Sequence, residues 1–381
     1  MPYGSETIEP GAALALSGGG FRAMLFHIGA VWRLNELGLL QGLKRISSVS
    51  GGSIFAGRLA VRWKHLNFDP TTLRALNYAE EVAQPLMAFS TRHVDAPAFL
   101  RGLLPLSSAA DAAAASYRKH VVGPATLQDL ESEAVAPRFV FNASHLGVGT
   151  TWRFSQPYMG SYRIGLIREP RTEIATAIAA SAAFPPVLSP LVLKDLTPDS
   201  FERTEGADLF DDVRLRMRAY LTDGGVYDNL GLETVWSRYE TLYVSDAGGG
   251  LAPRPGRYWI PGVSQLKRTL DIAVDQGRKL RRSAFAVDLK NTDRGGALWR
   301  TRLDPNNYYG EDPVFPVETS WPEHMAAIRT RLNPFSEMEQ KRLVNWGYLV
   351  SDMAIRTWAH KQAPEPTQLP FAGFGFDGTP P

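Results

Sequence analysis

Residues 12–22 read AALALSGGGFR, a stretch in which an apolar run meets three consecutive glycines. The run at residues 12–16 predicts a buried strand, and the glycines predict a tight loop after it. From Phe21 to Leu37 apolar residues recur at helical spacing, and Gly38 marks the end of that pattern. We therefore expect a strand, a glycine loop and a helix in this order.

A second unit of the same kind follows directly. Residues 43–53 read LKRISSVSGGS, which predicts a strand over residues 43–49, a loop at Ser50, and a helical pattern over residues 54–63. Two such units in tandem favour a parallel sheet with right-handed helical crossovers. Further strands are predicted at residues 138–143, 151–155, 216–221 and 241–244, and the first, third and fourth of these are expected inside the sheet. The sequence thus predicts a three-layer α/β fold, with a central, mostly parallel sheet flanked by helices.

A mostly helical insertion separates the second unit from the later strands. Helical patterns at residues 71–91 and 109–117, and an apolar stretch at residues 96–106, lie between them. We expect this insertion, over about residues 67–136, to form a cap at one end of the sheet.

The composition changes after Gly250. Three prolines within residues 253–261 mark a linker, and helical patterns follow at residues 263–289 and 335–360. Residues 363–381 are rich in Pro and Gly, which predicts a flexible tail. We expect one domain over residues 8–250, a helical C-terminal extension packed on it over residues 251–362, and the tail.

Charge and composition exclude several classes of protein. The 381 residues include 41 lysines and arginines against 39 aspartates and glutamates, without the basic excess of a dedicated nucleic-acid binder. The absence of cysteine excludes disulfides, a thiolate nucleophile and cysteine-based metal sites. The first ten residues lack the basic start of a secretory signal, and the longest apolar run, residues 174–188, is short of the ~18 residues of a spanning helix. We expect a cytoplasmic or peripheral membrane protein.

The glycine loop has two functional interpretations. Gly18, Gly20 and Ala23 match the G-x-G-x-x-A fingerprint of dinucleotide-binding folds. That fingerprint also needs an acidic residue at the end of the second strand, where this chain has serines and glycines, and no phosphate-loop lysine is present. We therefore expect no nucleotide. Backbone N–H groups of Gly18, Gly19 and Gly20 at a helix N-terminus instead suit an oxyanion hole, the alternative being a merely tight turn.

Ser50 is the best nucleophile candidate among the neighbouring serines. A serine at a sharp strand-to-helix turn needs small residues two positions before and two after it. Only Ser50 meets this condition, with Ser48 before it and Gly52 after it. Gly51 can add its own N–H to the oxyanion hole. Ser48 departs from the usual G-x-S-x-G, which has glycine there, and a polar serine loop is the alternative.

A nucleophilic serine needs a general base, and no histidine in the sequence stands out for this role. His27 lies between apolar residues of the first predicted helix and is expected to pack there. His145, just past a predicted strand, is the best placed of the seven histidines, but no acid close in sequence would orient it.

Asp223 fits the role of base better. It ends a predicted strand and is followed by two glycines, a turn that holds a carboxylate at the edge of a sheet. A carboxylate accepts the serine proton directly if burial raises its pKa. Asp246, at the end of the next strand, is its rival. Asp228 and Asn229 are expected to cap a helix beginning near Leu230.

Together these motifs resemble the patatin-like phospholipases. GGGFR at residues 18–22, SVSGG at residues 48–52 and DGG at residues 223–225 stand in the order of that family. AASAAFPP at residues 179–186 resembles the small-residue and proline block that precedes the catalytic aspartate in the family. The resemblance covers about residues 12–250.

The resemblance implies a three-layer patatin-like fold and acyl hydrolysis of lipids by a Ser50–Asp223 dyad. Gly18, Gly19, Gly20 and Gly51 would supply the oxyanion hole, and neither a metal nor a cofactor would take part. Arg22 would support the glycine loop or meet an anionic headgroup. The expected partners are a lipid or ester substrate and a membrane or micelle surface, with no nucleic acid and no nucleotide.

Two further interpretations stay open at this stage. A lipid-binding or interaction protein that kept the fold without turnover is the alternative to an enzyme, and Ser48 is its only support in the sequence. Residues 97–106, apolar with one charge, are either ordinary core or a mobile lid that dips into a lipid interface.

Overall fold

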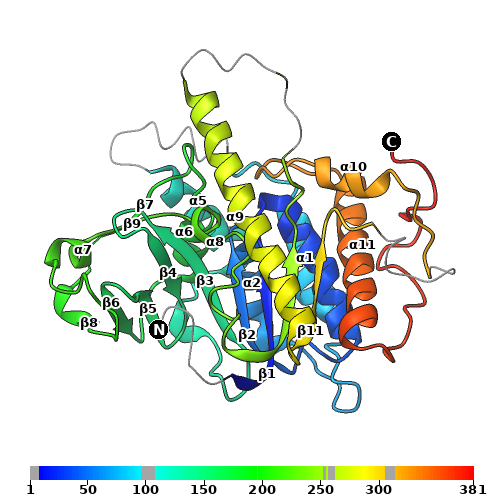
Figure 1. Ribbon diagram of the computed structural model, residues 1–381, viewed down its shortest axis with the longest axis horizontal. Coiled ribbons are helices and arrows are strands. Elements are labelled where there is room, and N and C mark those ends of the chain that lie inside the picture. Colours follow the sequence, from blue (N-terminus) through cyan, green and yellow to red (C-terminus); the bar gives the residue numbers. More distant parts are fainter. Residues whose placement is uncertain (1–7, 96–107, 195, 252–254, 256–261, 305–313) are drawn as a thin grey trace.

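The computed structural model describes residues 8–95, 108–194, 196–251, 255, 262–304 and 314–381. Within them an 11-stranded sheet has the order β11-β10-β1-β2-β3-β4-β5-β6-β8, and β9 pairs with β3 and β7. Figure 1 shows the sheet in the middle of the molecule. The strands are β1 (Glu9–Leu16), β2 (Leu43–Val49), β3 (Arg138–His145), β4 (Thr150–Phe154), β5 (Tyr158–Ser161), β6 (Gly165–Arg168), β7 (Leu191–Leu193), β8 (Phe201–Glu202), β9 (Ala219–Asp223), β10 (Tyr239–Asp246) and β11 (Gly295–Arg300).

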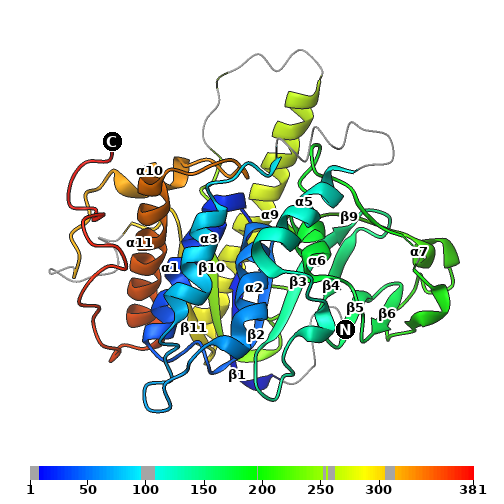
Figure 2. The same ribbon diagram turned by 180° about the vertical axis from the view of Figure 1, so that it is seen from behind.

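Helices cover both faces of this sheet. The α-helices are α1 (Gly20–Glu36), α2 (Gly51–Arg62), α3 (Gln84–Phe89), α5 (Ala109–Tyr117), α6 (Ile174–Ser181), α7 (Val213–Met217), α8 (Gly225–Asp228), α9 (Val263–Asn291), α10 (Trp321–Ala327) and α11 (Glu337–Ala354). Short 3₁₀ and π turns are η1 (Trp63–His65), η2 (Ala79–Ala83), η3 (Arg118–Val122), η4 (Leu127–Asp129), η5 (Pro198–Ser200) and η7 (Ile355–Ala359). In Figure 2, α1, α2, α3 and α11 lie in front of the sheet, whereas α9 lies behind it.

The predicted α/β fold is confirmed. β11, β10, β1, β2 and β3 run parallel, and Leu16 pairs with Ser245 on one side and Ser48 on the other. The carboxyl ends of β10, β1 and β2 therefore meet at one edge of the sheet. Beyond β3 the pairs are antiparallel, and the strand predicted at residues 151–155 also lies inside the sheet, because β4 pairs with both β3 and β5.

Two hydrophobic cores separate the layers. The larger one joins β1 and β2 to α1, α2 and α11 through side chains such as Phe26, Phe55 and Trp346. The smaller one lies on the opposite face, where Phe285 of α9 packs against Leu242 and Val244 of β10. A strand of the parallel sheet needs both faces covered, which explains why β1 and β10 are apolar on both sides.

The insertion differs in part from the expected helical cap. Residues 71–77 form turns and irregular structure with an isolated β-bridge from Ala75 to Phe68, and helical structure begins only at Tyr78, directly before η2 and α3. The expected helix at residues 109–117 is present as α5. The apolar segment at residues 97–106, interpreted above as core or lid, lies outside the described residues.

The part of the chain after residue 250 is not only helical. β11 pairs in parallel with β10 and so extends the central sheet. This strand was not predicted, because it is short and begins with two glycines. α11 is joined to α1 by a buried ion pair between Arg33 Nε and Asp352 Oδ1 at 2.8 Å.

Residues 363–381, expected as a flexible tail, make specific contacts in the structure. Phe376 is buried and its ring packs edge-on against Trp321 and Trp346. The side-chain amide of Asn345 donates to the carbonyls of Phe371 and Phe374. Pro and Gly in this segment prevent regular secondary structure, but they do not prevent packing against α10 and α11.

Candidate active site

Ser50 lies in a sharp turn between β2 and α2. Its backbone has φ 51° and ψ −117°, a left-handed conformation that a residue other than glycine adopts only under strain. A Cβ added to Gly52 would lie 2.6 Å from the carbonyl oxygen of Leu16, so this position needs glycine. The turn thus has the geometry that the sequence predicted for a nucleophilic serine.

Ser48, the departure from the usual motif, fits the turn without conflict. Its hydroxyl is buried, lies 3.0 Å from Ser53 Oγ and donates to the carbonyl of Val140 at 3.2 Å. A serine in place of glycine therefore has satisfied hydrogen bonds here.

Asp223 lies near Ser50 because β9 pairs with β3 at the point where the pairing of β2 with β3 ends. β2 pairs with β3 as far as Val49 and Asn142, and then the chain turns into α2. β9 pairs antiparallel with the next residues of β3, beginning with Asp223 opposite Ala143. Since β4 already occupies the other side of these β3 residues, β9 lies on the side of β2. The carboxyl ends of β2 and β9 therefore meet head to head.

The carboxylate of Asp223 lies near the side chain of Ser50, close enough for Ser50 to lower its pKa. Burial raises the pKa of Asp223 to about 6, although the nearby Ser50 side chain and the Gly225 N–H, which donates to Asp223 Oδ1 at 2.7 Å, act in the opposite direction. Asp223 is 2% exposed and Ser50 is 8% exposed. The pair is thus almost completely excluded from solvent, and its carboxylate is a far better proton acceptor than an exposed aspartate.

A single short segment at the C-terminal end of α6 binds both halves of this pair. The Ser50 N–H donates to Ser181 Oγ at 2.9 Å, and this hydroxyl donates to the carbonyl of Asn142 at 2.6 Å. The Asp223 N–H donates to the carbonyl of Ala183 at 2.9 Å, and the Gly224 N–H donates to the carbonyl of Ser181 at 3.1 Å. We call residues 181–183 the clasp. The AASAAFPP block signalled this segment, but the sequence did not predict its contacts.

The glycine loop lies against Ser50. Gly19 and Gly20 have φ values of 142° and 58°, and a Cβ on Gly20 would lie 1.9 Å from the carbonyl oxygen of Thr330. A Cβ on Gly51 would lie 2.1 Å from the carbonyl oxygen of Gly20, so the two backbones touch. The loop therefore tolerates no side chain at these positions.

The N–H groups of the loop are not equivalent. The Gly18 N–H donates to the carbonyl of Asn229 at 3.1 Å, so it is not free to bind an oxyanion as the sequence analysis expected. For the N–H groups of Gly19, Gly20 and Gly51, no acceptor is found within the described ranges. These three groups are the better candidates for binding an anionic oxygen.

Arg22 connects the glycine loop to the C-terminal end of α10. Its guanidinium is buried and donates to the carbonyls of Ala326 and Ile328, at 3.0 and 2.7 Å. Burial, followed by the nearby Arg278, lowers the pKa of Arg22 to about 10. These contacts favour the supporting role over contact with a headgroup.

The rival base Asp246 belongs to an ion-pair cluster. Arg278 and Arg282 of α9 donate to its carboxylate at 2.8 and 3.1 Å, and the Gly248 N–H donates at 2.9 Å. Burial alone would raise the pKa of Asp246, but the two guanidiniums hold it below its usual value. A carboxylate neutralised in this way is a poor proton acceptor.

His27 and His145, the two histidines named as candidates, make contacts with residues other than Ser50. His27 packs in α1 as expected, with Nε2 2.9 Å from the carbonyl oxygen of Ser17. Burial lowers the pKa of His27 to about 4. His145 ends β3 and its ring lies against Trp152, and in the described part of the chain neither ring nitrogen has a hydrogen-bond partner. Burial lowers the pKa of His145 to about 4 as well.

Asp228 caps turns rather than the helix that was expected near Leu230. Its carboxylate accepts the N–H groups of Leu230 and Glu233, at 3.2 and 2.9 Å. Residues 233–238 are turns in the structure.

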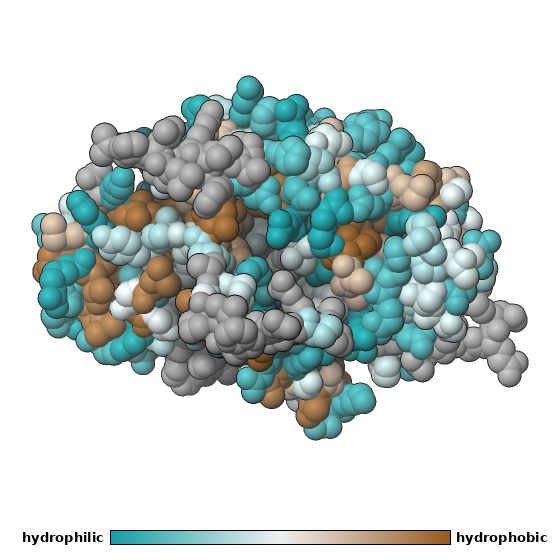
Figure 3. Space-filling view, turned by 90° about the horizontal axis from the view of Figure 1, so that it is seen from above, coloured by the Kyte–Doolittle hydropathy of each residue, from teal (hydrophilic) through white to brown (hydrophobic). Residues whose placement is uncertain are grey.

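Ser50 and Asp223 open into a cleft of about 1170 Å³. One wall is apolar and includes Phe184, Pro185, Val187 and Leu332. The other wall is one side of α9, with Ser264, Lys267, Arg268, Asp271, Val274, Asp275 and Arg278. Figure 3 looks onto the molecule from above, where apolar and polar residues border one another. The cleft therefore offers an apolar side and a charged side to a bound molecule.

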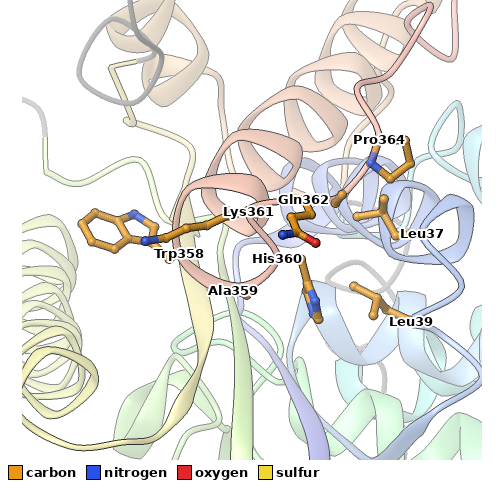
Figure 4. A pocket seen from close by; sticks show the side chains of 9 residues that line it. Leu37, Leu39, Trp358, Ala359, His360, Lys361, Gln362 and Pro364 are labelled. Carbon is orange, nitrogen blue, oxygen red and sulfur yellow. The ribbon is translucent and has the colours of Figure 1, made fainter.

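A second cavity, of about 610 Å³, lies beside η7. Figure 4 shows Leu37, Leu39 and Gln362 around the ring of His360. His360 Nε2 lies 2.7 Å from the hydroxyl of Tyr243, on which its ring also stacks. This cavity brings together none of the residues that the sequence singled out.

A family model described as patatin-like phospholipase matches residues 14–236, more than half of the chain. The chain belongs to the patatin-like phospholipase family. No curated protein shows a significant sequence match to it.

Solved structures of related proteins are only distantly similar. Human GIVD cytosolic phospholipase A2 is 14% identical, with a TM-score of 0.39 over 63% of this chain and 46% of its own. The same enzyme in complex with methyl gamma-linolenyl fluorophosphonate is 14% identical, with a TM-score of 0.48 over 90% of this chain and 57% of its own. VipD from Legionella pneumophila is 15% identical, with a TM-score of 0.38 over 92% and 67%. The chain thus spans less than two thirds of the human enzyme.

No helix in the described ranges has the length and apolar character that crossing a bilayer requires.

Proposed function

We propose that the protein is a lipid acyl hydrolase of the phospholipase A or esterase type, with Ser50 as nucleophile and Asp223 as general base. The observation that carries this proposal is that Ser50, held in a strained turn, and Asp223, whose pKa is raised to about 6, are buried side chains that meet at the same cleft. A general base transfers protons best when its pKa lies close to the ambient pH, as the raised pKa of Asp223 does at physiological pH. Membership of the family supports a lipid substrate.

The mechanism follows from the positions of these groups. Ser50 Oγ attacks the ester carbonyl carbon while its proton passes to the carboxylate of Asp223. The N–H groups of Gly19, Gly20 and Gly51 bind the oxygen that becomes negative in the tetrahedral intermediate. The ester C–O bond then breaks, and Asp223 returns the proton to the departing alcohol.

Release of the acyl group repeats these steps with water. Asp223 accepts a proton from water while the water oxygen attacks the acyl–Ser50 carbonyl carbon; the bond from this carbon to Ser50 Oγ then breaks, the carboxylic acid leaves, and Asp223 returns the proton to Ser50 Oγ. The apolar wall of the cleft, with Phe184 and Leu332, suits the acyl chain. Ser48, the one sequence feature that favoured a member without turnover, fits the turn with satisfied hydrogen bonds, which supports an enzyme over that alternative.

Labelling with a fluorophosphonate tests this proposal directly. The probe should attach to Ser50, located by mass spectrometry of the digested protein, and labelling should be absent in Ser50→Ala. Hydrolysis of phospholipid, galactolipid, neutral glyceride and short-chain esters then defines the substrate. Folded protein that is neither labelled nor active on any of these esters would contradict the assignment.

A further inference from the structure

Asn229 brings a side-chain amide to the junction of the glycine loop and the turn after Asp223. A Cβ added to Gly18 would lie 2.4 Å from Asn229 Oδ1 and 3.0 Å from Ser50 Cβ, so these two atoms are neighbours. A Cβ added to Gly225 would lie 2.5 Å from Asn229 Oδ1 and 2.9 Å from Asp223 Oδ1. All five residues line the cleft. The side-chain oxygen of Asn229 is therefore close to both members of the proposed dyad.

Within the described residues, the side-chain amide of Asn229 has no hydrogen-bond partner. The sequence predicted this residue as a helix cap, but the N–H groups of Leu230 and Glu233 donate to Asp228 instead. The main-chain carbonyl of Asn229 has a separate role, as the acceptor of the Gly18 N–H. The oxygen and the N–H groups of the amide are thus available to a molecule that enters the cleft.

Gly225 separates the oxygens of Asn229 and Asp223. It is the first residue of α8 and has no positive φ, so its conformation alone does not require glycine. A side chain is excluded because its Cβ would come too close to both oxygens. Both oxygens are hydrogen-bond acceptors, so a molecule bound between them must be a donor. A water molecule donates one hydrogen bond to each of two acceptors, and its lone pairs then point away from both.

We propose that Asn229 is a further catalytic residue, which together with Asp223 orients the water that releases the acyl group. This inference rests on the proposed function. The water donates one hydrogen to Asp223 and the other to Asn229 Oδ1, so a lone pair of its oxygen faces the carbonyl carbon of acyl–Ser50. The new C–O bond forms as the first proton passes to Asp223, and the second hydrogen stays on the carboxylic acid. The bond from carbon to Ser50 Oγ then breaks, the acid leaves, and Asp223 returns its proton to Ser50 Oγ.

The role assigned to Asn229 is confined to the second half of the reaction. Attack of Ser50 on the ester uses no water, so acylation should not need the Asn229 side chain. A further oxyanion donor would act in both halves, because a tetrahedral intermediate forms in each. A residue that only supports the turn would also affect both halves. The ratio of the acylation and deacylation rates therefore distinguishes the proposed role from these two.

Asn229→Leu tests the assignment, because leucine is similar in size to asparagine but accepts no hydrogen bond. Rapid mixing with p-nitrophenyl butyrate separates the burst of p-nitrophenol, which reports acylation, from the steady phase, which reports deacylation. We expect deacylation to slow about tenfold to a hundredfold, and acylation to change by about twofold at most. Mass spectrometry of the intact protein should show that acyl–Ser50 accumulates in the variant. The rate of fluorophosphonate labelling at Ser50 should stay the same.

Two further variants control for packing and for the loss of an amide. Asn229→Ala cannot overfill the site and should slow deacylation in the same way, even if leucine disturbs the fold. The matched control is Asn333→Ala, which removes another asparagine that lines the cleft. The Oδ1 of Asn333 accepts a hydrogen bond from Arg329 Nε at 3.2 Å, far from this role in the reaction. Asn333→Ala should leave the ratio of the two rates unchanged.

Three results would overturn the inference, and one of them also concerns the proposed function. Equal slowing of acylation and deacylation in both Asn229 variants would make Asn229 an oxyanion donor or a structural residue. Unchanged deacylation in both variants would exclude any part in water attack, while labelling of Ser50 would leave the proposed function intact. Folded protein that neither reacts with the fluorophosphonate nor cleaves the ester would reject the proposed function, and this inference with it.

Discussion

The main-chain N–H of Ser50 donates a hydrogen bond to the hydroxyl of Ser181, 131 residues further along the chain, at 2.9 Å. The carbonyl of Ser181 accepts the N–H of Gly224, next to Asp223. Nucleophile and base candidates thus share one structural support, the clasp at residues 181–183. Their separation is set by this segment and not by either strand alone.

Ser181→Ala should lower kcat for ester hydrolysis by about tenfold to a hundredfold, with little change in KM. Loss of the hydroxyl leaves the Ser50 N–H without its acceptor, so the strained turn relaxes and Ser50 Oγ moves away from Asp223. Steady-state kinetics on a soluble short-chain ester measures both constants.

Ser53→Ala is the control for that variant. It removes a hydroxyl that also contacts Ser181, at 2.8 Å, but leaves the hydrogen bond from Ser50 in place. Both variants should lose about 1–2 kcal/mol of stability. Equal losses of kcat in the two variants would mean that Ser181 acts only through stability.

Ser50→Ala should abolish ester hydrolysis, by about four orders of magnitude, because only the attacking hydroxyl is lost. Circular dichroism and the melting temperature establish that the fold persists. Residual activity of more than a few per cent would identify another nucleophile.

Asp223→Asn should be as damaging to kcat as Ser50→Ala, since an amide cannot accept the serine proton. Asp246→Asn should reduce activity far less, because this carboxylate is neutralised by Arg278 and Arg282. The two variants are compared under identical conditions on the same ester. A larger loss in Asp246→Asn would make Asp246 the base.

The same two substitutions should change stability in opposite directions. The pKa of Asp223 is raised from 3.8 to about 6 in the folded chain, so this group destabilises the fold as pH rises through that window. At neutral pH, Asp223→Asn should therefore stabilise the protein by about 1–3 kcal/mol. Asp246→Asn leaves buried guanidiniums undercompensated and should destabilise it by about 3 kcal/mol. Chemical denaturation gives both free energies of unfolding.

The activity should depend on pH with a midpoint near 6. Burial raises the pKa of Asp223 to about 6, and the protonated acid cannot take the proton of Ser50. We expect kcat/KM to fall about tenfold per pH unit below this midpoint and to level off above it. A profile measured from about pH 4 to about pH 8 on a soluble ester shows the midpoint. A midpoint near 4 would point to an exposed carboxylate instead.

Local sequence was enough to predict the parts of the site. The apolar run, the three glycines at residues 18–20 and the small neighbours of Ser50 specify strand, loop and turn, because such conformations depend on residues only a few positions apart. Asp223 could be preferred over Asp246 for the same reason, from the strand and glycines around it. Family membership follows from the order of these motifs.

Only the tertiary structure decided how the parts meet. Three features depend on contacts between segments that are distant in sequence. β9 pairs antiparallel with the end of β3, and the Gly18 N–H donates to the carbonyl of Asn229. Arg278 and Arg282 neutralise Asp246. β11 was not predicted, because its local sequence has no clear strand pattern and its strand conformation comes from parallel pairing with β10. The pKa of Asp223 likewise comes from burial, and burial is a property of the packed chain that no local pattern contains.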